Sequence, residues 1–251
     1  MKKLKNSKIA IILPCYNEEK NIIHVINELE LLKKEFSFIK FIFVNDGSID
    51  NTLEILKTLG DRIILLNLPC NLGVGGAVQS GFHYVAENDF DYALKFDGDG
   101  QHTIESISKL LNALHKNDAD MVIGSRFCYK KQDGFKSNFM RRQGINFFKY
   151  FIKILSGYKP TDATSGIRCY SKKAIKFLKT YYPAFDYPEP EEIILMKKND
   201  FKIIDCPVVM RERMEGKSSI NFLKSFYFMI KVTFAIFMIS VRPKILTKKE
   251  K

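Results

Sequence analysis

The stretch Tyr92-Ala93-Leu94-Lys95-Phe96-Asp97-Gly98-Asp99-Gly100-Gln101-His102 decides how the rest of the chain is interpreted. Its first half is rich in apolar and aromatic residues, which favour a buried strand, and its second half alternates Asp with Gly, which favour a turn. Asp97 and Asp99 therefore follow the end of a predicted strand, one residue apart. Carboxylate oxygens are ligands that hard divalent cations prefer. The tetrapeptide Asp-Gly-Asp-Gly alone is equally compatible with a solvated turn.

Size and charge narrow the classes of protein to consider. With 251 residues the chain is long enough for one domain with a sizeable core. A formal net charge of +12 predicts an anionic partner, such as nucleotide phosphate, nucleic acid or an acidic membrane face. A merely soluble basic surface is the alternative. The five cysteines show neither a Cys-x-x-Cys pair nor zinc spacing, which predicts reduced thiols in a cytosolic protein without a signal peptide.

Strands and helices alternate along the first half of the chain. The expected strands are 8–13, 39–44, 62–66, 92–96 and 121–123, and the expected helices are 18–32, 51–59, 75–87 and 103–115. Asn17 is expected to cap the first helix. The second half predicts helices over 138–155, 172–178 and up to 198, a short strand near 167–170, and an edge strand over 201–210 that contains Pro207. Alternation at this spacing predicts an α/β fold with a mostly parallel sheet flanked by helices.

Polar motifs follow four of these strands. They are Tyr16-Asn17-Glu18, Asp46-Gly47-Ser48, Asp97-Gly98-Asp99 and Ser125-Arg126. Ligands of such sheets bind beyond the carboxyl ends of the strands, so the four loops are expected to converge on one site. A tendency to form turns explains each motif alone but not their shared location.

Taken in order, six motifs resemble those of family 2 glycosyltransferases with a GT-A (Rossmann-like) fold. The motifs are 14–19 (PCYNEE), 44–48 (VNDGS), 71–73 (NLG), 96–102 (FDGDGQH), 124–126 (GSR) and 164–168 (TSGIR). The likeness covers about 8 to 220 and is greatest to the branch that contains dolichyl-phosphate mannosyltransferase and bacterial polyprenyl-phosphate glycosyltransferases. It implies a GT-A domain over 1–217, and the pattern of the remaining residues predicts an amphipathic basic helix and tail over 218–251.

The resemblance implies roles for the matching positions. Residues expected to bind the nucleotide-sugar are Pro14, Tyr16, Asn17, Glu18, Asp46, Gly73 and Asp97. Asp97, Asp99 and Gln101 are expected to hold Mg²⁺ or Mn²⁺, and Arg126, Arg141, Arg142, Ser165 and Arg168 to hold an acceptor phosphate. Asp99, Arg126 and Arg168 are also expected to be catalytic.

Elementary chemistry agrees with these roles. The departing diphosphate gains negative charge, which a cation on carboxylates can neutralise, and the arginine fork suits phosphate. Arg211, Arg213 and Lys217 lie in a basic stretch that is expected to close over the diphosphate, with a solvated charge run as the alternative. One of Glu189, Glu191 and Glu192, with Glu191 preferred, or else Asp162, is a candidate general base toward an acceptor hydroxyl. An ionised phosphate acceptor needs no base. The role of His102 stays open between a phosphate contact and a contact with the nearby chain.

The C-terminal segment 220–242 is apolar, with Lys224, Lys231 and Arg242 spaced along one helical stripe. Such a helix is expected to lie at a membrane surface with its cations toward anionic headgroups, and packing on the domain is the alternative. Together these features predict a peripheral enzyme on the inner face of the cell membrane, with a small membrane protein as a further candidate partner.

The expected reaction is metal-dependent transfer of a sugar, with inversion as the family implies, from a UDP- or GDP-sugar to a polyprenyl phosphate or a membrane-linked glycan. Transfer to a sugar hydroxyl and a non-catalytic, nucleotide-binding membrane adaptor are alternatives. A nucleic-acid-binding module is disfavoured, because Asp46, Asp97 and Asp99 would place carboxylates where phosphate has to bind.

Overall fold

The computed structural model describes residues 2–98, 102–128, 139–183, 187–209 and 222–245. The strands are β1 (Ile9–Cys15), β2 (Ile39–Asn45), β3 (Ile64–Asn67), β4 (Tyr92–Lys95), β5 (Met121–Ser125), β6 (Arg168–Ser171) and β7 (Ile203–Pro207). The α-helices are α1 (Lys2–Lys5), α2 (Ile22–Leu29), α3 (Thr52–Thr58), α4 (Gly73–Glu87), α5 (Ile104–Asn117), α6 (Phe139–Ser156), α7 (Lys172–Tyr181), α8 (Glu189–Lys198) and α9 (Phe222–Val241). Two short 3₁₀ helices, η1 (Glu30–Lys34) and η2 (Gly60–Arg62), complete the described elements.

The strands form one sheet in the order β3-β2-β1-β4-β6-β5-β7. All paired strands run parallel except β6, which is antiparallel to both β4 and β5. The predicted mostly parallel α/β sheet is thereby confirmed, and β7 lies at its edge as expected. Because β6 is reversed, its first residue, Arg168, lies beside the last residue of β4, Lys95, at the edge where the other strands end.

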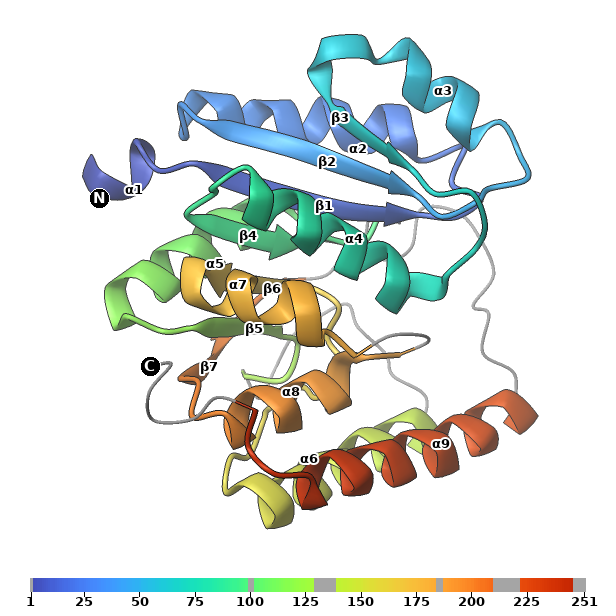
Figure 1. The fold of residues 1–251 in the computed structure, drawn as a ribbon, viewed down its shortest axis with the longest axis vertical. Coiled ribbons are helices and arrows are strands. Elements are labelled where there is room, and N and C mark those ends of the chain that lie inside the picture. Colours follow the sequence, from blue (N-terminus) through green and yellow to red (C-terminus); the bar gives the residue numbers. More distant parts are fainter. Residues whose placement is uncertain (1, 99–101, 129–138, 184–186, 210–221, 246–251) are drawn as a thin grey trace.

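Helices cover both faces of the sheet (Figure 1). One core packs α2 and α5 against the sheet, with Val25, Ile26 and Leu110 among its fully buried members. The second core lies on the opposite face under α4 and α7, and it continues into α6, α8 and α9. Figure 1 shows α6 and α9 as an outer pair of helices, with α8 between them and the sheet. The lower end of the molecule in this view is therefore built by the second half of the chain.

Two local expectations at the first strand are wrong. Pro14 does not end β1, which continues to Cys15. Pairing with β4 stops at Ile12, so beyond that residue β1 has a partner on only one side, where proline is tolerated. Asn17 does not cap a helix: its φ is +56°, and α2 starts later, after Asn21. The side chain of Asn17 is instead used between two loops, as described below.

The C-terminal helix α9 packs on the domain through Val232 and Ile236, which are completely buried. Within the ranges that the structure describes, no helix has both the length and the apolarity needed to cross a membrane.

Candidate active site

The loops that follow β1 and β2 are joined by reciprocal hydrogen bonds. The amide of Asn17 donates to Ser48 Oγ at 3.1 Å, and the amide of Ile49 donates back to Asn17 Oδ1 at 3.0 Å. The amide of Glu18 donates to Thr52 Oγ1 at 2.8 Å. These contacts explain why Asn17 is not a helix cap, and they hold the first two predicted nucleotide loops as one unit.

Asp46 ties the second loop to the loop that follows β3. Its Oδ1 accepts the amide of Leu72 at 2.7 Å, and the residue is buried. Gly47 has a φ of +65°, and a Cβ there would lie 2.7 Å from backbone atoms of Cys70 and Asn71, so only glycine fits. The structure therefore shows Asp46 supporting the loops, while its contact with a nucleotide stays a prediction.

Asp97 lies just beyond β4, in a turn next to the end of β1. The next residue, Gly98, packs against the end of β1: a Cβ atom added to it would lie 3.8 Å from the carbonyl oxygen of Pro14. The Asp97 side chain is 36% exposed, and no hydrogen bond within the described part of the chain occupies its carboxylate. Two available carboxylate oxygens at a loop tip suit an oxygen-binding divalent cation. Its predicted partners in this role, Asp99 and Gln101, lie outside the described residues.

Among the described residues, no group of three or more His, Cys, Asp or Glu side chains is arranged to hold a metal. Among the described residues, His102 forms a contact with Asp97, and its Nε2 lies 4.0 Å from Asp97 Oδ2. His102 is almost fully buried, and burial lowers its pKa, so the imidazole is neutral at pH 7. No partner for a hydrogen bond to its Nδ1 lies within the described residues. The structure thus places His102 beside the candidate metal turn rather than on a free surface.

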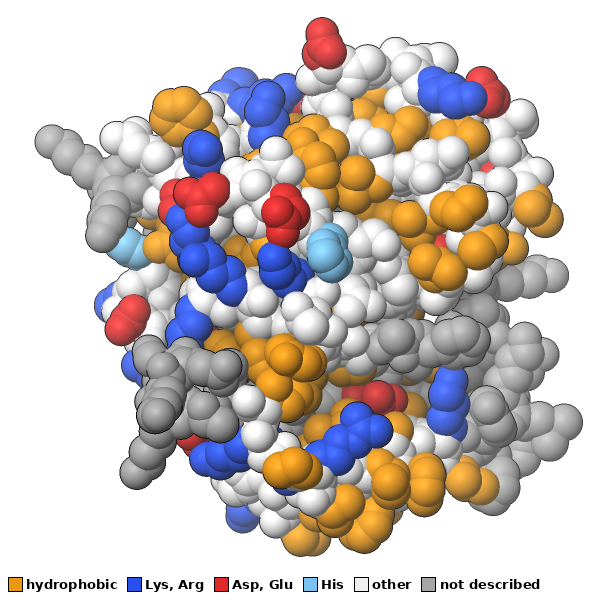
Figure 2. All heavy atoms as spheres, viewed as in Figure 1, with side chains coloured by type: hydrophobic (Ala, Val, Ile, Leu, Met, Phe, Trp, Pro, Cys, Tyr) orange, Lys and Arg blue, Asp and Glu red, His pale blue; other side chains and the backbone are white. Residues whose placement is uncertain are grey.

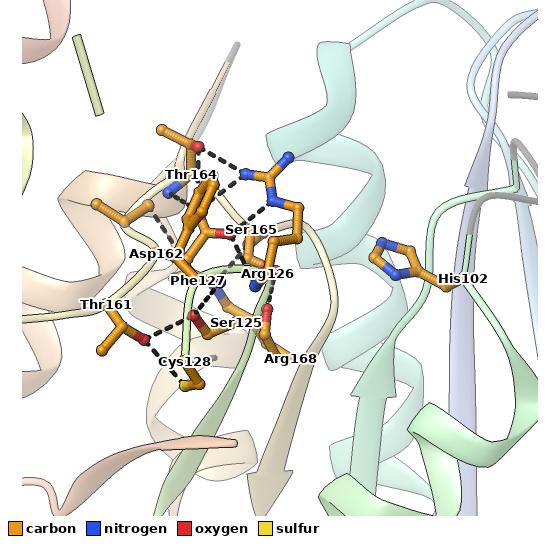
Figure 3. A network of polar contacts seen from close by, with 12 residues as sticks. His102, Ser125, Arg126, Phe127, Cys128, Thr161, Asp162, Thr164, Ser165 and Arg168 are labelled. Atoms are coloured by element: carbon orange, nitrogen blue, oxygen red, sulfur yellow. Dashed lines mark hydrogen bonds and ion pairs between the residues drawn. The ribbon is translucent and has the colours of Figure 1, made fainter. Parts of the chain in front are cut away.

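Arg126 makes a buried two-pronged ion pair with Asp162 (Figure 3). Its Nε lies 2.6 Å from Asp162 Oδ2 and its Nη2 lies 2.8 Å from Oδ1, while Nη2 also donates to Thr164 Oγ1 at 3.0 Å. Burial disfavours the charged guanidinium, but the hydrogen bonds and charge of Asp162 outweigh it and raise the pKa of Arg126. The predicted phosphate fork is therefore occupied by Asp162 in this structure. Asp162 is equally engaged, which removes it as a candidate base.

Arg168 is enclosed rather than exposed at the site. Its guanidinium is 0% exposed and contacts Glu192 Oε2 at 2.8 Å, together with the carbonyls of Ser165 and Ala163. Ser165 is also buried, and its hydroxyl donates to the carbonyl of Gly124. Neither side chain can reach an acceptor phosphate without a rearrangement. The geometry thus argues for internal roles in place of the predicted phosphate contacts.

The remaining predicted residues fall into two groups. Tyr16 is exposed at the first loop, and Gly73, with a φ of +75°, starts α4. Glu191 is half-buried on α8, and burial raises its pKa to about 7, although Lys231 of α9 acts to lower it. The structure does not describe the side chains of Arg141 and Arg142 on α6, nor any part of Arg211, Arg213 and Lys217.

Sequence reasoning missed Lys95, and it considered Glu189 only as one of the candidate general bases. Lys95 and Glu189 form a buried ion pair with Nζ and Oε1 2.5 Å apart. A lysine inside an otherwise apolar strand is the signal that could have found it, because a buried ammonium requires a carboxylate partner. No comparable signal identifies which of the three glutamates 189, 191 and 192 provides that partner.

A family model described as glycosyl transferase family 2 matches residues 10–178. The chain belongs to glycosyl transferase family 2. It is therefore a glycosyltransferase, as the motifs predict, and its sheet and flanking helices are those expected for the GT-A fold.

Several relatives in this family are known by activity. The chain is 34% identical to UDP-N-acetylglucosamine–dolichyl-phosphate N-acetylglucosaminyltransferase of Methanococcus voltae, over 80% of this chain and 84% of that protein. It is 25% identical to polyprenol monophosphomannose synthase of Mycolicibacterium smegmatis, over 85% and 81%. These names support the predicted branch, and they come from an archaeon and a bacterium.

Solved structures agree on the fold. Glucosyl-3-phosphoglycerate synthase of Mycobacterium tuberculosis, in complex with Mn²⁺, UDP and phosphoglyceric acid, superposes with a TM-score of 0.71 at 15% identity. The match covers 97% of this chain and 84% of that one. At such low identity the likeness establishes the GT-A architecture alone.

Gly166 provides a direct test of the Asp97 position. A Cβ on Gly166 would overlap the Asp97 carboxylate, so Gly166→Ala is expected to push that side chain aside while leaving the buried sheet intact. We expect transfer to fall by roughly 100-fold, the size of effect that a displacement of about 1 Å can produce. Thermal unfolding should change little. Ser37→Ala is the control, because Ser37 is exposed before β2 and lies outside the site loops. Wild-type activity of Gly166→Ala would contradict the assigned position of Asp97.

Proposed function

We propose that this family 2 glycosyltransferase moves a sugar from a UDP- or GDP-sugar to a polyprenyl phosphate at a membrane surface, with Mg²⁺ or Mn²⁺ and with inversion. The observation that carries the proposal is the available Asp97 carboxylate in the turn that lies against the end of β1. The relatives that act on dolichyl phosphate or polyprenol support the acceptor class.

On the donor side, the joined loops after β1, β2 and β3 orient the nucleotide, and Asp97 with Asp99 and Gln101 would hold the cation. The cation supplies charge neutralisation for the departing diphosphate. Asn17 and Asp46 keep these loops in place through the 3.0 Å bond from Ile49 and the 2.7 Å bond from Leu72. A preformed set of loops lowers the ordering cost of binding the donor.

On the acceptor side, a phosphate oxygen attacks the anomeric carbon of the donor, the new glycosyl–oxygen bond forms, and the bond to the diphosphate breaks. An acceptor phosphate is already ionised at neutral pH, so no protein base is required. A sugar hydroxyl would require one, and Glu191, with its pKa raised to about 7 by burial, is the carboxylate suited to that alternative.

The acceptor class can be separated through Glu191. Glu191→Gln is expected to leave kcat/KM for a polyprenyl phosphate largely unchanged, including any rise near pH 6 from ionisation of the acceptor itself. For a hydroxyl acceptor the same substitution removes a rise centred near pH 7, because the neutral amide cannot accept the proton. Initial rates from pH 5 to 8 on both acceptors check this. Loss of phosphate transfer in Glu191→Gln would contradict the phosphate mechanism.

The donor and the activity are tested together. Thermal unfolding of the full chain with UDP, GDP, CDP or dTDP, each with and without Mn²⁺, identifies the nucleotide by ligand-linked stabilisation. Labelled sugars of that nucleotide are then incubated with a polyprenyl phosphate or with a glycan. Labelled glycolipid is the expected product. Nucleotide stabilisation without transfer to either acceptor would instead favour the non-catalytic adaptor.

The outer helices α6 and α9 give the membrane part of the proposal its physical basis. Their exposed apolar side chains include Ile154, 79% exposed, and Phe234, 65% exposed. A groove of about 550 Å³ runs between the two helices. Its lining residues are Phe147, Phe151, Met229, Ile230, Thr233, Phe234 and Phe237. Figure 2 shows hydrophobic side chains gathered at this end, with Lys and Arg side chains beside them.

A bilayer interface fits this arrangement because an apolar face with cations at its margin is attracted to anionic lipid headgroups. The predicted cationic stripe on α9 needs correction at Lys231, which is partly buried and interacts with Glu191 of α8. The exposed face of α9 is apolar along the described part of the helix, with Phe237 and Val241 also on it. The proposed membrane contact is therefore made by α6 and α9 together, with an apolar centre. A small membrane protein is the competing occupant.

Membrane binding is expected to depend on the exposed phenylalanines. Phe234→Ser with Phe237→Ser should weaken binding to anionic phosphatidylglycerol vesicles at least ~100-fold, because burying each ring contributes about 1.5–3 kcal/mol. Vesicle sedimentation measures it. Phe38→Ser is the control, since Phe38 is 56% exposed before β2. Unchanged binding of the double variant would leave the membrane protein as the occupant.

A further inference from the structure

Two buried cationic side chains lie side by side in the sheet, just before the turn that carries Asp97. Lys95 ends β4 and Arg168 starts β6, and the two residues are direct cross-strand partners. Directly opposed residues of an antiparallel pair project to the same face of the sheet. Both side chains are 0% exposed. Two adjacent cations repel one another, so this face requires negative charge from the element packed on it.

Helix α8 provides that charge from its first turn. Glu189 and Glu192 are three residues apart and therefore share one face of the helix. Lys95 Nζ lies 2.5 Å from Glu189 Oε1, and Arg168 Nη1 lies 2.8 Å from Glu192 Oε2. Carboxylates in a first helical turn also interact favourably with the helix dipole. We call these four residues the charge clamp.

Stability alone gives no reason for such an arrangement. Desolvating two ion pairs is expensive, and well-packed apolar residues of similar volume commonly serve at least as well. The surroundings of the clamp are also imperfectly satisfied. Within the described residues no hydrogen bond of regular geometry reaches the buried Tyr182 hydroxyl, and the Tyr170 hydroxyl approaches Glu192 without forming one. Charged partners differ from apolar ones because their hydrogen bonds require a defined geometry. Each ion pair therefore fixes the position of one carboxylate of α8 relative to the sheet.

The clamp joins the two sides of the site. Lys95 precedes Asp97 by two residues, so it belongs to the donor side. Helix α8 carries Glu191 in the clamped turn and packs against both α6 and α9. These two helices make the membrane contact of the proposed function, so a polyprenyl phosphate would arrive from their side, which we call the acceptor side. Figure 1 shows α8 between the sheet and these two helices. A displacement of the first turn of α8 would therefore move the acceptor side relative to the donor side.

We propose that Lys95, Arg168, Glu189 and Glu192 are positioning residues that fix the first turn of α8 against the end of β4, and so align the acceptor with the donor sugar. The naming of α6, α8 and α9 as the acceptor side rests on the proposed function. The transfer reaction itself rests on membership of the family.

A paired apolar replacement separates positioning from stability. Lys95→Met with Glu189→Leu removes both charges and leaves neither partner unpaired, so its Tm is expected within a few degrees of wild type. We expect kcat for transfer to fall roughly 10- to 100-fold, because the first turn of α8 is no longer held in one position against β4. KM for the nucleotide-sugar, and the Mn²⁺-dependent thermal shift with the nucleotide, should stay at wild-type values. The matched control is Lys179→Met with Glu87→Leu, which removes an exposed ion pair of 2.8 Å between α7 and α4.

A double variant with wild-type Tm and wild-type kcat, or a control with an equal loss of kcat, overturns the proposal. If the double variant does not fold, Glu189→Asp decides, because it keeps the charge but shortens the reach by one methylene. A reduced kcat at unchanged Tm supports positioning, and a wild-type kcat overturns it. The kcat of each variant is compared with that of the wild type, on the acceptor that the tests under the proposed function identify. If that acceptor is not a polyprenyl phosphate, the wild-type protein shows it, whereas only the variants show whether the charge clamp positions α8.

Discussion

Replacing Asp97 by Asn is expected to lower kcat about 1000-fold and to abolish the Mn²⁺-dependent part of the thermal shift produced by the nucleotide. Removing one electrostatic stabiliser of developing charge costs roughly 100- to 1000-fold, and this substitution also removes a cation ligand. The Asp97 carboxylate is available for that role, because it is 36% exposed and no hydrogen bond among the described residues occupies it. Nucleotide binding without the cation should survive, since the loops joined by Asn17 and Asp46 do not depend on Asp97.

Steady-state kinetics with the identified donor, run over a series of Mn²⁺ concentrations, measures the effect. Asp61→Asn is the matched control, because Asp61 is an exposed carboxylate in η2, before β3. A variant that keeps its Mn²⁺-dependent shift would show that the cation is held without Asp97. Equal losses in both variants would point to a general effect of lowering negative charge.

The fold was predictable because hydrophobic patterning and turn residues report it locally. The alternation of apolar runs with amphipathic segments predicted the parallel sheet, and Pro207 correctly marked β7 as an edge strand. The end of β1 was not predictable in the same way, because proline is usually a strand breaker and Pro14 therefore predicts an end at residue 13. A one-sided strand tolerates proline, and only the pairing with β4, which stops at Ile12, shows that β1 is one-sided there.

The position of a site residue was predictable where neighbouring residues of the same loop determine it. It was not predictable where a residue distant in the sequence determines the contact. The position of Asp97 at a loop tip followed from its sequence alone. The enclosure of Arg168 depends on Glu192, which is 24 residues away, and the engagement of Arg126 depends on Asp162, 36 residues away. Arginine suits phosphate and carboxylate equally well, so its residue type does not reveal which of the two it binds.

Arg126 is the residue for which this ambiguity has the largest measurable consequence. Arg126→Leu is expected to destabilise the fold by about 3–5 kcal/mol, because it leaves the completely buried Asp162 carboxylate without its cation. For a domain of this size that corresponds to a Tm lower by roughly 10 °C. Arg126→Lys should lie between the variant and wild type, since it keeps the charge but loses the two-pronged contact.

Thermal unfolding of Arg126→Leu and of the double variant Arg126→Leu with Asp162→Leu distinguishes the two roles. If the ion pair is internal, removing both partners restores most of the Tm, because no buried charge is left unpaired. If Arg126 instead leaves Asp162 to bind the acceptor phosphate, the double variant regains stability while its KM for the acceptor stays raised at least ~10-fold, the loss expected for one charge-assisted contact of about 1.5–3 kcal/mol. A Tm of Arg126→Leu equal to wild type would contradict both roles, because each starts from the closed pair that the structure shows.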